Sequence, residues 1–262
     1  MLPYFRVAFR DVIPAYDSNM TITEKISLSR AYLMEKDQER AQQLLEDALL
    51  SNPDHPEVIA LRAVLYMMQA QYANAIEYLE KAKALDPHLE MIYYNLAKSY
   101  RKSDQLDRAE EAARKALVLD PANFQAHVEL SCTLFKTARA KEAIDHLQEA
   151  IHIDPDFLKA YLILGQLCKT AGAMDDATLL YRNALERLPD AHMLREELCA
   201  IYEAKEDFDS AYKEAAEIAA RRNLASDYVR AGKYAMLLGS LNAADAAFRK
   251  AAELNPKMER NT

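Results

Sequence analysis

Glycine is scarce in this sequence. Four of the 262 residues are glycine, whereas average usage is about 7%. Loops that cradle phosphate groups need several glycines at close spacing. The four glycines, at positions 165, 172, 232 and 239, match neither the dinucleotide-binding pattern nor the P-loop pattern. Nucleotide binding of these two kinds is therefore disfavoured.

Other absences narrow the class of protein further. The sequence has no tryptophan and no run of 18 apolar residues, so we expect no membrane span. Its N terminus has no secretory signal pattern. Three widely spaced cysteines, Cys132, Cys168 and Cys199, do not make a disulfide framework. We expect them to be buried, reduced thiols, and we expect a cytoplasmic location.

The charge and the titratable residues argue against nucleic-acid binding and against catalysis. The formal net charge is −8 and the isoelectric point is about 5.4, whereas nucleic-acid binders usually carry a basic excess. The six histidines form no HExxH motif, and the cysteines have no metal-ligand spacing. We therefore expect no nucleic-acid partner, no metal, no cofactor and no enzymatic activity.

The dominant feature of the sequence is a repeat of 34 residues. Pro53, Pro87, Pro121, Pro155 and Pro189 stand 34 residues apart, and proline ends helices because it cannot continue the hydrogen-bond ladder. Within each period, apolar residues follow helical spacing in two stretches that a polar break separates. A fixed period of this size indicates stacked supersecondary units, so each period is expected to form two antiparallel helices.

Small residues recur at fixed places in each period. The twentieth place holds alanine in seven copies: Ala41, Ala75, Ala109, Ala143, Ala177, Ala211 and Ala244. The eighth place holds small residues: Ser29, Ala63, Ala97, Ser131, Gly165, Cys199 and Gly232. This pattern resembles the tetratricopeptide repeat family over about residues 22 to 257. The resemblance implies an all-α fold, a right-handed superhelical solenoid of about seven antiparallel helix pairs.

The period divides the chain into seven repeats and two end segments. The predicted repeats comprise residues 22–55, 56–89, 90–123, 124–157, 158–191, 192–224 and 225–257. An N-terminal capping or docking segment, residues 1–21, precedes them, and a tail, residues 258–262, follows. The sixth repeat is one residue short and has Asn223 where proline belongs. We expect a distorted junction at that point.

The resemblance implies a concave groove, lined by the first helix of each pair, that binds a peptide or a protein. The places that tend to face this groove hold apolar residues: Leu61, Val64, Met67, Met68, Tyr94, Val128, Phe135, Leu162 and Ile163. Polar and basic residues rim this strip: Asn95, Lys98, Arg101, Lys102, Lys136, Gln166 and Lys169. An exposed apolar strip usually marks an interaction site, and the basic rim predicts a partner that is apolar with acidic residues.

Two alternatives to an open groove remain at this point. Curvature of the solenoid could bury part of the strip, or the N-terminal segment could fill it. Four apolar residues of that segment follow helical spacing on one face: Phe5, Phe9, Val12 and Ile13. Another interpretation of the segment is a cap over the first repeat, since terminal repeats need covers.

The last predicted helix has no polar cover in the sequence. This suggests self-association through the ends of the array or a longer native chain. The main functional hypothesis is accordingly a scaffold or adaptor that binds a partner peptide or helix in its groove. The alternative is a self-associating structural assembly protein whose groove is filled by its own N-terminal segment.

Overall fold

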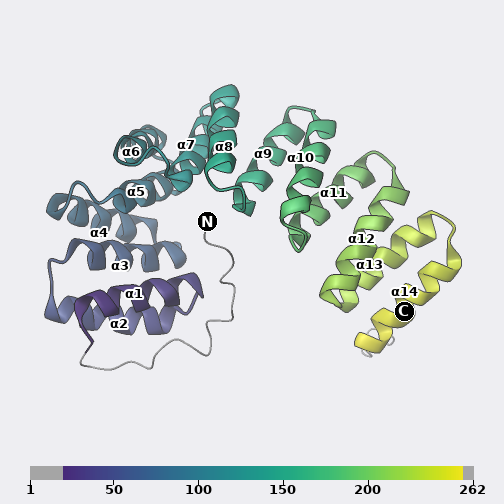
Figure 1. Cartoon of the computed structure of the whole chain (residues 1–262), viewed down its shortest axis with the longest axis horizontal. Helices are drawn as coiled ribbons and strands as arrows, with labels where there is room; N and C mark the ends of the chain where they lie inside the picture. Colours follow the sequence, from purple (N-terminus) through teal and green to yellow (C-terminus); the bar gives the residue numbers. More distant parts are fainter. Residues whose placement is uncertain (1–19, 256–262) are drawn as a thin grey trace. The chain divides into compact units, whose positions relative to one another are not determined.

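The computed structural model describes residues 20–255, and the regular structure of these residues is helical throughout (Figure 1). The predicted all-α fold class is confirmed. Most of the predicted capping segment, with Phe5, Phe9, Val12 and Ile13, and the whole tail lie outside the described residues. The helices are α1 Ile22–Met34, α2 Gln38–Ser51, α3 Pro56–Met68, α4 Tyr72–Leu85, α5 Glu90–Lys102, α6 Leu106–Leu119, α7 Phe124–Lys136, α8 Ala140–Ile153, α9 Leu158–Thr170, α10 Met174–Arg187, α11 His192–Ala204, α12 Phe208–Arg222, α13 Ala225–Leu237 and α14 Leu241–Leu254.

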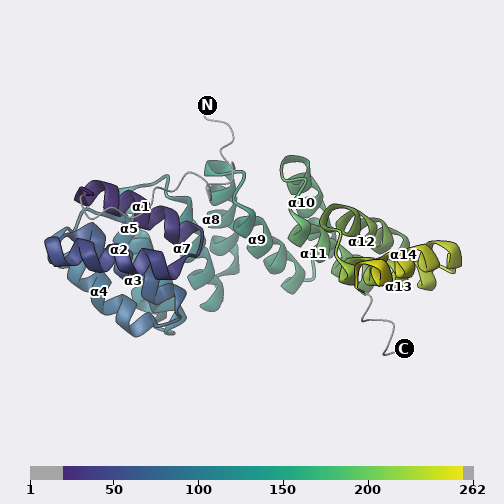
Figure 2. The ribbon, with the colours of Figure 1, turned by 90° about the horizontal axis from the view of Figure 1, so that it is seen from below.

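The helices belong to two compact units, residues 1–146 and 147–262. In the first unit, α1 packs on α2, α3 on α4 and α5 on α6, and the first helices of successive pairs also contact one another, α1 with α3, α3 with α5 and α5 with α7. In the second unit, α9 packs on α10, α11 on α12 and α13 on α14. Figures 1 and 2 show these helix pairs within each unit.

The turn inside every pair has the same backbone geometry. One residue of each turn adopts a left-handed conformation: Lys36, Ala70, Asp104, Ala138, Gly172, Glu206 and Gly239. The next residue donates its backbone N–H to a carbonyl five residues earlier, for example from Arg139 to Leu134 at 2.9 Å. This is the hydrogen bond that closes a helix at a left-handed residue. Five of these seven turns use a residue other than glycine, although only glycine takes this conformation without a steric penalty.

The small residues of the repeat sit where helices of a pair approach closely. All seven alanines at the twentieth place are buried, and so are the seven residues at the eighth place. At Gly165, a Cβ atom would lie 2.1 Å from the hydroxyl of Tyr181, and at Gly232 it would lie 2.7 Å from the ring of Phe248. Interiors are packed to crystal density, so these places tolerate little added volume.

The junction after the sixth pair differs from the others. Helix α12 has 15 residues, one more than α10 or α14, and it ends at Asn223 in a left-handed conformation with φ of 52°. Asparagine tolerates this conformation and therefore ends helices without a proline. The next helix begins two residues later. The distortion predicted at Asn223 is confirmed, and the left-handed end absorbs the missing residue.

Candidate functional site

The predicted groove residues of the first unit lie on three neighbouring first helices, α3, α5 and α7. We call the surface they form the first-helix face. Three of its seven predicted apolar residues are buried: Leu61, Met67 and Val128. Three more are half-buried, namely Val64, Met68 and Tyr94, and Phe135 is exposed. The prediction that the whole apolar strip is exposed is therefore wrong for the three buried residues. Their side chains are buried because first helices of successive repeats pack directly on one another.

A buried ion pair crosses the first-helix face. Arg101 on α5 donates from Nη2 to Oε2 of Glu129 on α7 at 2.5 Å, and from Nε to the same oxygen at 3.0 Å. The two side chains are 12% and 4% exposed. The guanidinium that the sequence placed on a basic rim is thus neutralised inside the protein, and it fastens one repeat to the next.

The other polar residues expected on this face also find intramolecular partners or turn inward. Lys136 donates from Nζ to Oδ1 of Asp104 at 2.9 Å. Asn95 is buried and donates from Nδ2 to the carbonyl of Met91 at 2.9 Å, within its own helix. Lys98 is half-buried, and Lys102 remains exposed at the end of α5. The first-helix face is therefore less basic than the sequence suggests.

The remaining predicted site residues lie on α9, in the second unit. Leu162 and Ile163 are half-buried and Gln166 is exposed. Lys169 donates from Nζ to Oε2 of Glu197 on α11 at 2.5 Å. This pair occupies the same two places in its repeats as Arg101 and Glu129, 28 residues apart in each case. Both units thus use a cation at the twelfth place and a glutamate at the sixth place of the next repeat.

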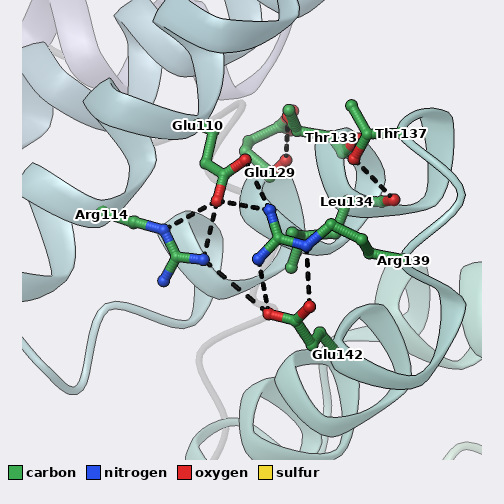
Figure 3. A network of polar contacts seen from close by, with 8 residues as sticks. All are labelled: Glu110, Arg114, Glu129, Thr133, Leu134, Thr137, Arg139 and Glu142. Atoms are coloured by element: carbon green, nitrogen blue, oxygen red, sulfur yellow. Dashed lines mark hydrogen bonds and ion pairs between the residues drawn. The ribbon is translucent and has the colours of Figure 1, made fainter.

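A second polar cluster, which sequence reasoning missed, joins α6 to the start of α8 in the first unit. Figure 3 shows Arg139 between two carboxylates. Its Nη1 donates to both oxygens of Glu110, at 2.8 and 2.9 Å, and its Nε donates to Glu142 at 2.7 Å. Burial opposes ionisation of Glu110, but hydrogen bonds from Arg114 and Arg139 lower the pKa of its carboxyl below the ordinary value. The side chains of this cluster are partly exposed, and exposed ion pairs contribute little to the free energy of unfolding. We therefore expect the cluster mainly to position the turn before α8.

A pair of histidines connects α7 to α8 in the first unit. His127 Nε2 lies 3.1 Å from the carbonyl of Pro121, and its Nδ1 lies 3.0 Å from Nδ1 of His146. A carbonyl only accepts, so His127 donates from Nε2. With one proton on each ring, Nδ1 of His127 then accepts from Nδ1 of His146. Burial, and then the neighbouring His127, lower the pKa of His146.

This histidine contact belongs to a recurring device at the fourth place of the repeat. Tyr93 donates from its hydroxyl to the carbonyl of Pro87 at 2.9 Å, and Tyr161 donates to the carbonyl of Pro155 at 3.0 Å. Each ring thus satisfies the carbonyl of the proline that ends the preceding repeat. His127 occupies the same place, so its role here is structural.

The chemistry available for catalysis or metal binding is sparse. Within residues 20–255, no three or more histidine, cysteine, aspartate or glutamate side chains are grouped so that they could hold a metal ion. None of the three cysteines, all of which lie within the described residues, forms a disulfide, and Cys132 and Cys168 are half-buried. Burial, and then the nearby Glu214, raise the pKa of Cys199 to about 12. A thiol reacts as its thiolate, so Cys199 is expected to be unreactive.

Across the described part of the chain, every helix is too short or too polar to serve as a membrane span.

Models of known families match most of the repeat region. A model described as tetratricopeptide repeat matches residues 28–90 and 133–192, and a second model with that description matches residues 228–258. Together these two models cover more than half of the chain. A model described as anaphase-promoting complex, cyclosome, subunit 3 matches residues 68–150. In a search of curated proteins, no sequence match reached significance.

Many solved structures share this arrangement of helix pairs. One is TTC0263, a thermophilic tetratricopeptide repeat protein of Thermus thermophilus, with 21% identity, a TM-score of 0.62 and coverage of 69% of this chain and 98% of that one. PilW, a type IV pilus biogenesis factor, has 22% identity, a TM-score of 0.58 and coverage of 77% and 94%. The Cut9-Hcn1 hetero-tetramer of the APC/C has 15% identity, a TM-score of 0.63 and coverage of 92% and 47%. At these identities the likeness is one of fold.

Proposed function

Because the chain belongs to the tetratricopeptide repeat family, we propose that it is a non-enzymatic scaffold that binds a polypeptide segment of a partner protein and supports assembly of a multiprotein complex. Among the proteins of similar fold, PilW is a biogenesis factor and Cut9-Hcn1 is a hetero-tetramer. A role in assembly by this chain agrees in kind with both. A cytoplasmic location is part of the proposal, and three cysteines that form no disulfide within the described residues suit a reducing compartment.

The observation that carries this proposal is the exposure of Phe135 on the first-helix face. Its ring is 41% exposed, although the adjacent Leu134 is fully buried. Helix α7 therefore meets its packing needs without Phe135. Aromatic side chains are enriched at protein interfaces, where they carry much of the binding energy. Half-buried Met68 and Tyr94, on the same face, would extend the apolar contact.

The charge of the first-helix face sets the kind of partner that it suits. Arg101 and Lys136 are paired with carboxylates of the protein itself, which leaves Lys102 as an exposed cation at the edge. The segment that fits this face is therefore mainly apolar, with acidic residues at its margin. Methionine and aromatic side chains adapt to such segments with little entropic cost.

The test is capture of a partner from native cell extract by the wild type and by Met68→Glu with Phe135→Glu. We expect the double variant to lose the partner and to keep its thermal midpoint within a few degrees, about the range of a surface change. Val118→Glu is the matched control, since Val118 is 73% exposed on α6, away from the first-helix face, and it should retain the partner.

Two outcomes would count against this proposal. If the wild type and the control capture no partner and the double variant melts early, these side chains are packed. The alternative of a self-associating protein with an internally filled groove then gains support, and light scattering over a range of protein concentrations should show oligomers. If the double variant still captures the partner, binding uses another surface.

A further inference from the structure

The turn between α13 and α14 exposes a cluster of large apolar side chains. Met236, Leu237, Leu238 and Leu241 are 56%, 60%, 40% and 70% exposed. They lie within six consecutive residues, at the end of α13, in the turn and at the first position of α14. We call them the α13–α14 patch. Exposed apolar residues scattered singly are normal, but a contiguous group marks an interaction surface.

Comparison with the other turns indicates that the turn itself does not require Leu238. The fourteenth place, which follows the first helix, holds Glu35, Gln69, Ser103, Thr137, Ala171, Lys205 and Leu238. All seven turns share one backbone geometry, so a large apolar residue is not needed to form it. The α13–α14 pair is instead held by buried residues such as Ala235, Ala244 and Ala251. Leu238 therefore serves something other than the turn. Leu241 stands at the seventeenth place, where other repeats hold the half-buried Tyr72, Leu106, Met174 and Phe208, whereas Leu241 itself is 70% exposed.

Two cations share the surface of α13 with the patch. Arg230, Lys233 and Leu237 stand at positions i, i+3 and i+7, which lie on one face of a helix. Lys233 is exposed and Arg230 is half-buried. Within residues 20–255, neither forms a hydrogen bond or an ion pair. Lys169 on α9, in contrast, is neutralised by Glu197. The surface of α13 thus joins exposed apolar area to positive charge that the protein leaves unpaired.

We propose that the α13–α14 patch, together with Arg230 and Lys233, is a second docking surface, and that it binds an amphipathic partner segment carrying leucine-like side chains flanked by carboxylates. The proposal rests on the proposed function as a protein-binding scaffold but uses a different surface. Apolar burial would supply the affinity, and the two cations would select acidic segments over basic ones.

Charge disfavours the other occupants. In a symmetric dimer the same patch of both molecules forms the interface, so four cations, Arg230 and Lys233 of each molecule, would enter one interface. An anionic membrane surface is usually recognised by clusters of about four to eight basic residues, whereas this surface has two and the whole chain has a net charge of −8. In the N-terminal segment of this chain, Asp11 and Asp17 balance Arg6 and Arg10, so this segment lacks the excess of carboxylates that the two cations favour.

The test uses two fluorescent peptides of about 14 residues, long enough for about four helical turns. Both carry leucines on one helical face. One has glutamates beside the leucines and the other has lysines at the same positions. Fluorescence anisotropy with the full chain should show binding of the glutamate peptide, about tenfold weaker binding of the lysine peptide, and a loss of this preference at high salt.

Charge reversal provides the decisive variant. Arg230→Glu with Lys233→Glu should weaken the glutamate peptide about tenfold or more and should strengthen the lysine peptide. Leu237→Ser with Leu241→Ser should weaken both peptides. The matched control is Leu179→Ser, because Leu179 is 61% exposed on α10 of the same unit, and it should change neither affinity.

Several results would overturn the proposal. One is that the glutamate peptide does not bind at concentrations up to about 1 mM. Another is that the two peptides bind equally. A third is that Leu179→Ser weakens binding as much as Leu237→Ser with Leu241→Ser does. Sedimentation of a wild-type dimer that Leu237→Ser with Leu241→Ser abolishes would assign the patch to a second copy. Binding to vesicles of anionic lipid that the charge reversal abolishes would assign it to a membrane.

The Phe135→Glu variant separates the two proposals. It disrupts the first-helix face, which suits the same class of peptide, and it leaves the α13–α14 patch intact because Phe135 lies on α7 of the first unit. The glutamate peptide should therefore still bind to Phe135→Glu, and adding Arg230→Glu with Lys233→Glu should weaken that remaining binding. If Phe135→Glu abolishes partner capture while the α13 variants change no affinity, the proposed function stands and the second docking surface fails.

Discussion

Gly165 and Tyr181 form one complementary pair. The aromatic ring of Tyr181, on α10, occupies the volume that any side chain at Gly165, on α9, would need, because a Cβ there would lie 2.1 Å from the hydroxyl oxygen. Gly232 and Phe248 repeat the arrangement in the last pair. Opposite Ser29, Ala63 and Ser131 the twenty-fourth place holds leucine, and opposite Ala97 and Cys199 it holds alanine. Glycine thus occupies the eighth place in the two repeats whose twenty-fourth place holds an aromatic residue.

This relationship predicts that Gly165→Ala destabilises the protein, although alanine favours a helix by about 1 kcal/mol over glycine. Overpacking against Tyr181 should cost about 1–3 kcal/mol of unfolding free energy. Adding Tyr181→Leu should restore space, so the double variant should be more stable than the sum of the single changes by about 1 kcal/mol or more. Chemical denaturation of the four proteins measures the coupling, and strictly additive changes would contradict it.

The left-handed turns predict stabilising substitutions. Ala70 and Ala138 have φ values of 58° and 61°, a conformation that costs a residue with a Cβ atom roughly 1–2 kcal/mol. Replacing either by glycine should raise the unfolding free energy by about 0.5–1 kcal/mol, after the extra chain entropy of glycine is subtracted. Gly172→Ala, at the same place of another turn, should lower it by a similar amount. A lower denaturation midpoint for Ala138→Gly would show that its turn is not strained.

The buried ion pair predicts a strong and asymmetric response. Arg101→Met removes the guanidinium that neutralises the buried carboxylate of Glu129 and should cost about 3–5 kcal/mol of unfolding free energy. Replacing both residues, with Glu129→Leu as the second change, should recover much of that loss, because an apolar pair needs no desolvation of charge. The exposed pair of Lys136 and Asp104 is the control, and Lys136→Ala should cost no more than about 0.5 kcal/mol. Equal effects of Arg101→Met and Lys136→Ala would refute a special role for burial.

The histidine pair predicts a loss of stability in mild acid. The pKa of His146 is lowered from its ordinary value of 6.5, so the unfolded chain binds a proton at this residue more readily than the folded chain does. The unfolding free energy should therefore fall as the pH drops from above 6.5 toward the folded-state pKa, and the loss should be complete below that value.

The variant that tests this pH dependence is His146→Gln, which keeps an N–H donor toward His127 and removes the titration. It should flatten the decline in thermal midpoint between about pH 7 and pH 5. His152→Gln is the control, since His152 is exposed on α8, and it should leave the decline unchanged. An identical pH profile for the wild type and His146→Gln would assign the acid sensitivity to other groups.

The candidate site was only partly predictable from the sequence. Places in the repeat correctly indicated that Phe135 is not needed for packing, but they also suggested exposure of Leu61 and Met67, which neighbouring first helices bury. The pair of Arg101 and Glu129 had a signal that reasoning on single residues overlooked. The same two places carry Lys169 and Glu197, 28 residues apart, and comparison of charges between adjacent repeats would have found both pairs.

The helix pairs, their period and the irregular junction at Asn223 follow from the sequence alone. They depend on local and recurring requirements: proline ends helices, helical spacing aligns apolar residues, and alanine at the twentieth place admits a close neighbour. Only the tertiary structure decided which of the predicted surface residues are exposed and which pair within the protein. Whether Arg101 faces a partner or Glu129 depends on which side chain of the next repeat comes within hydrogen-bonding distance, and that distance is set by how the first helices pack.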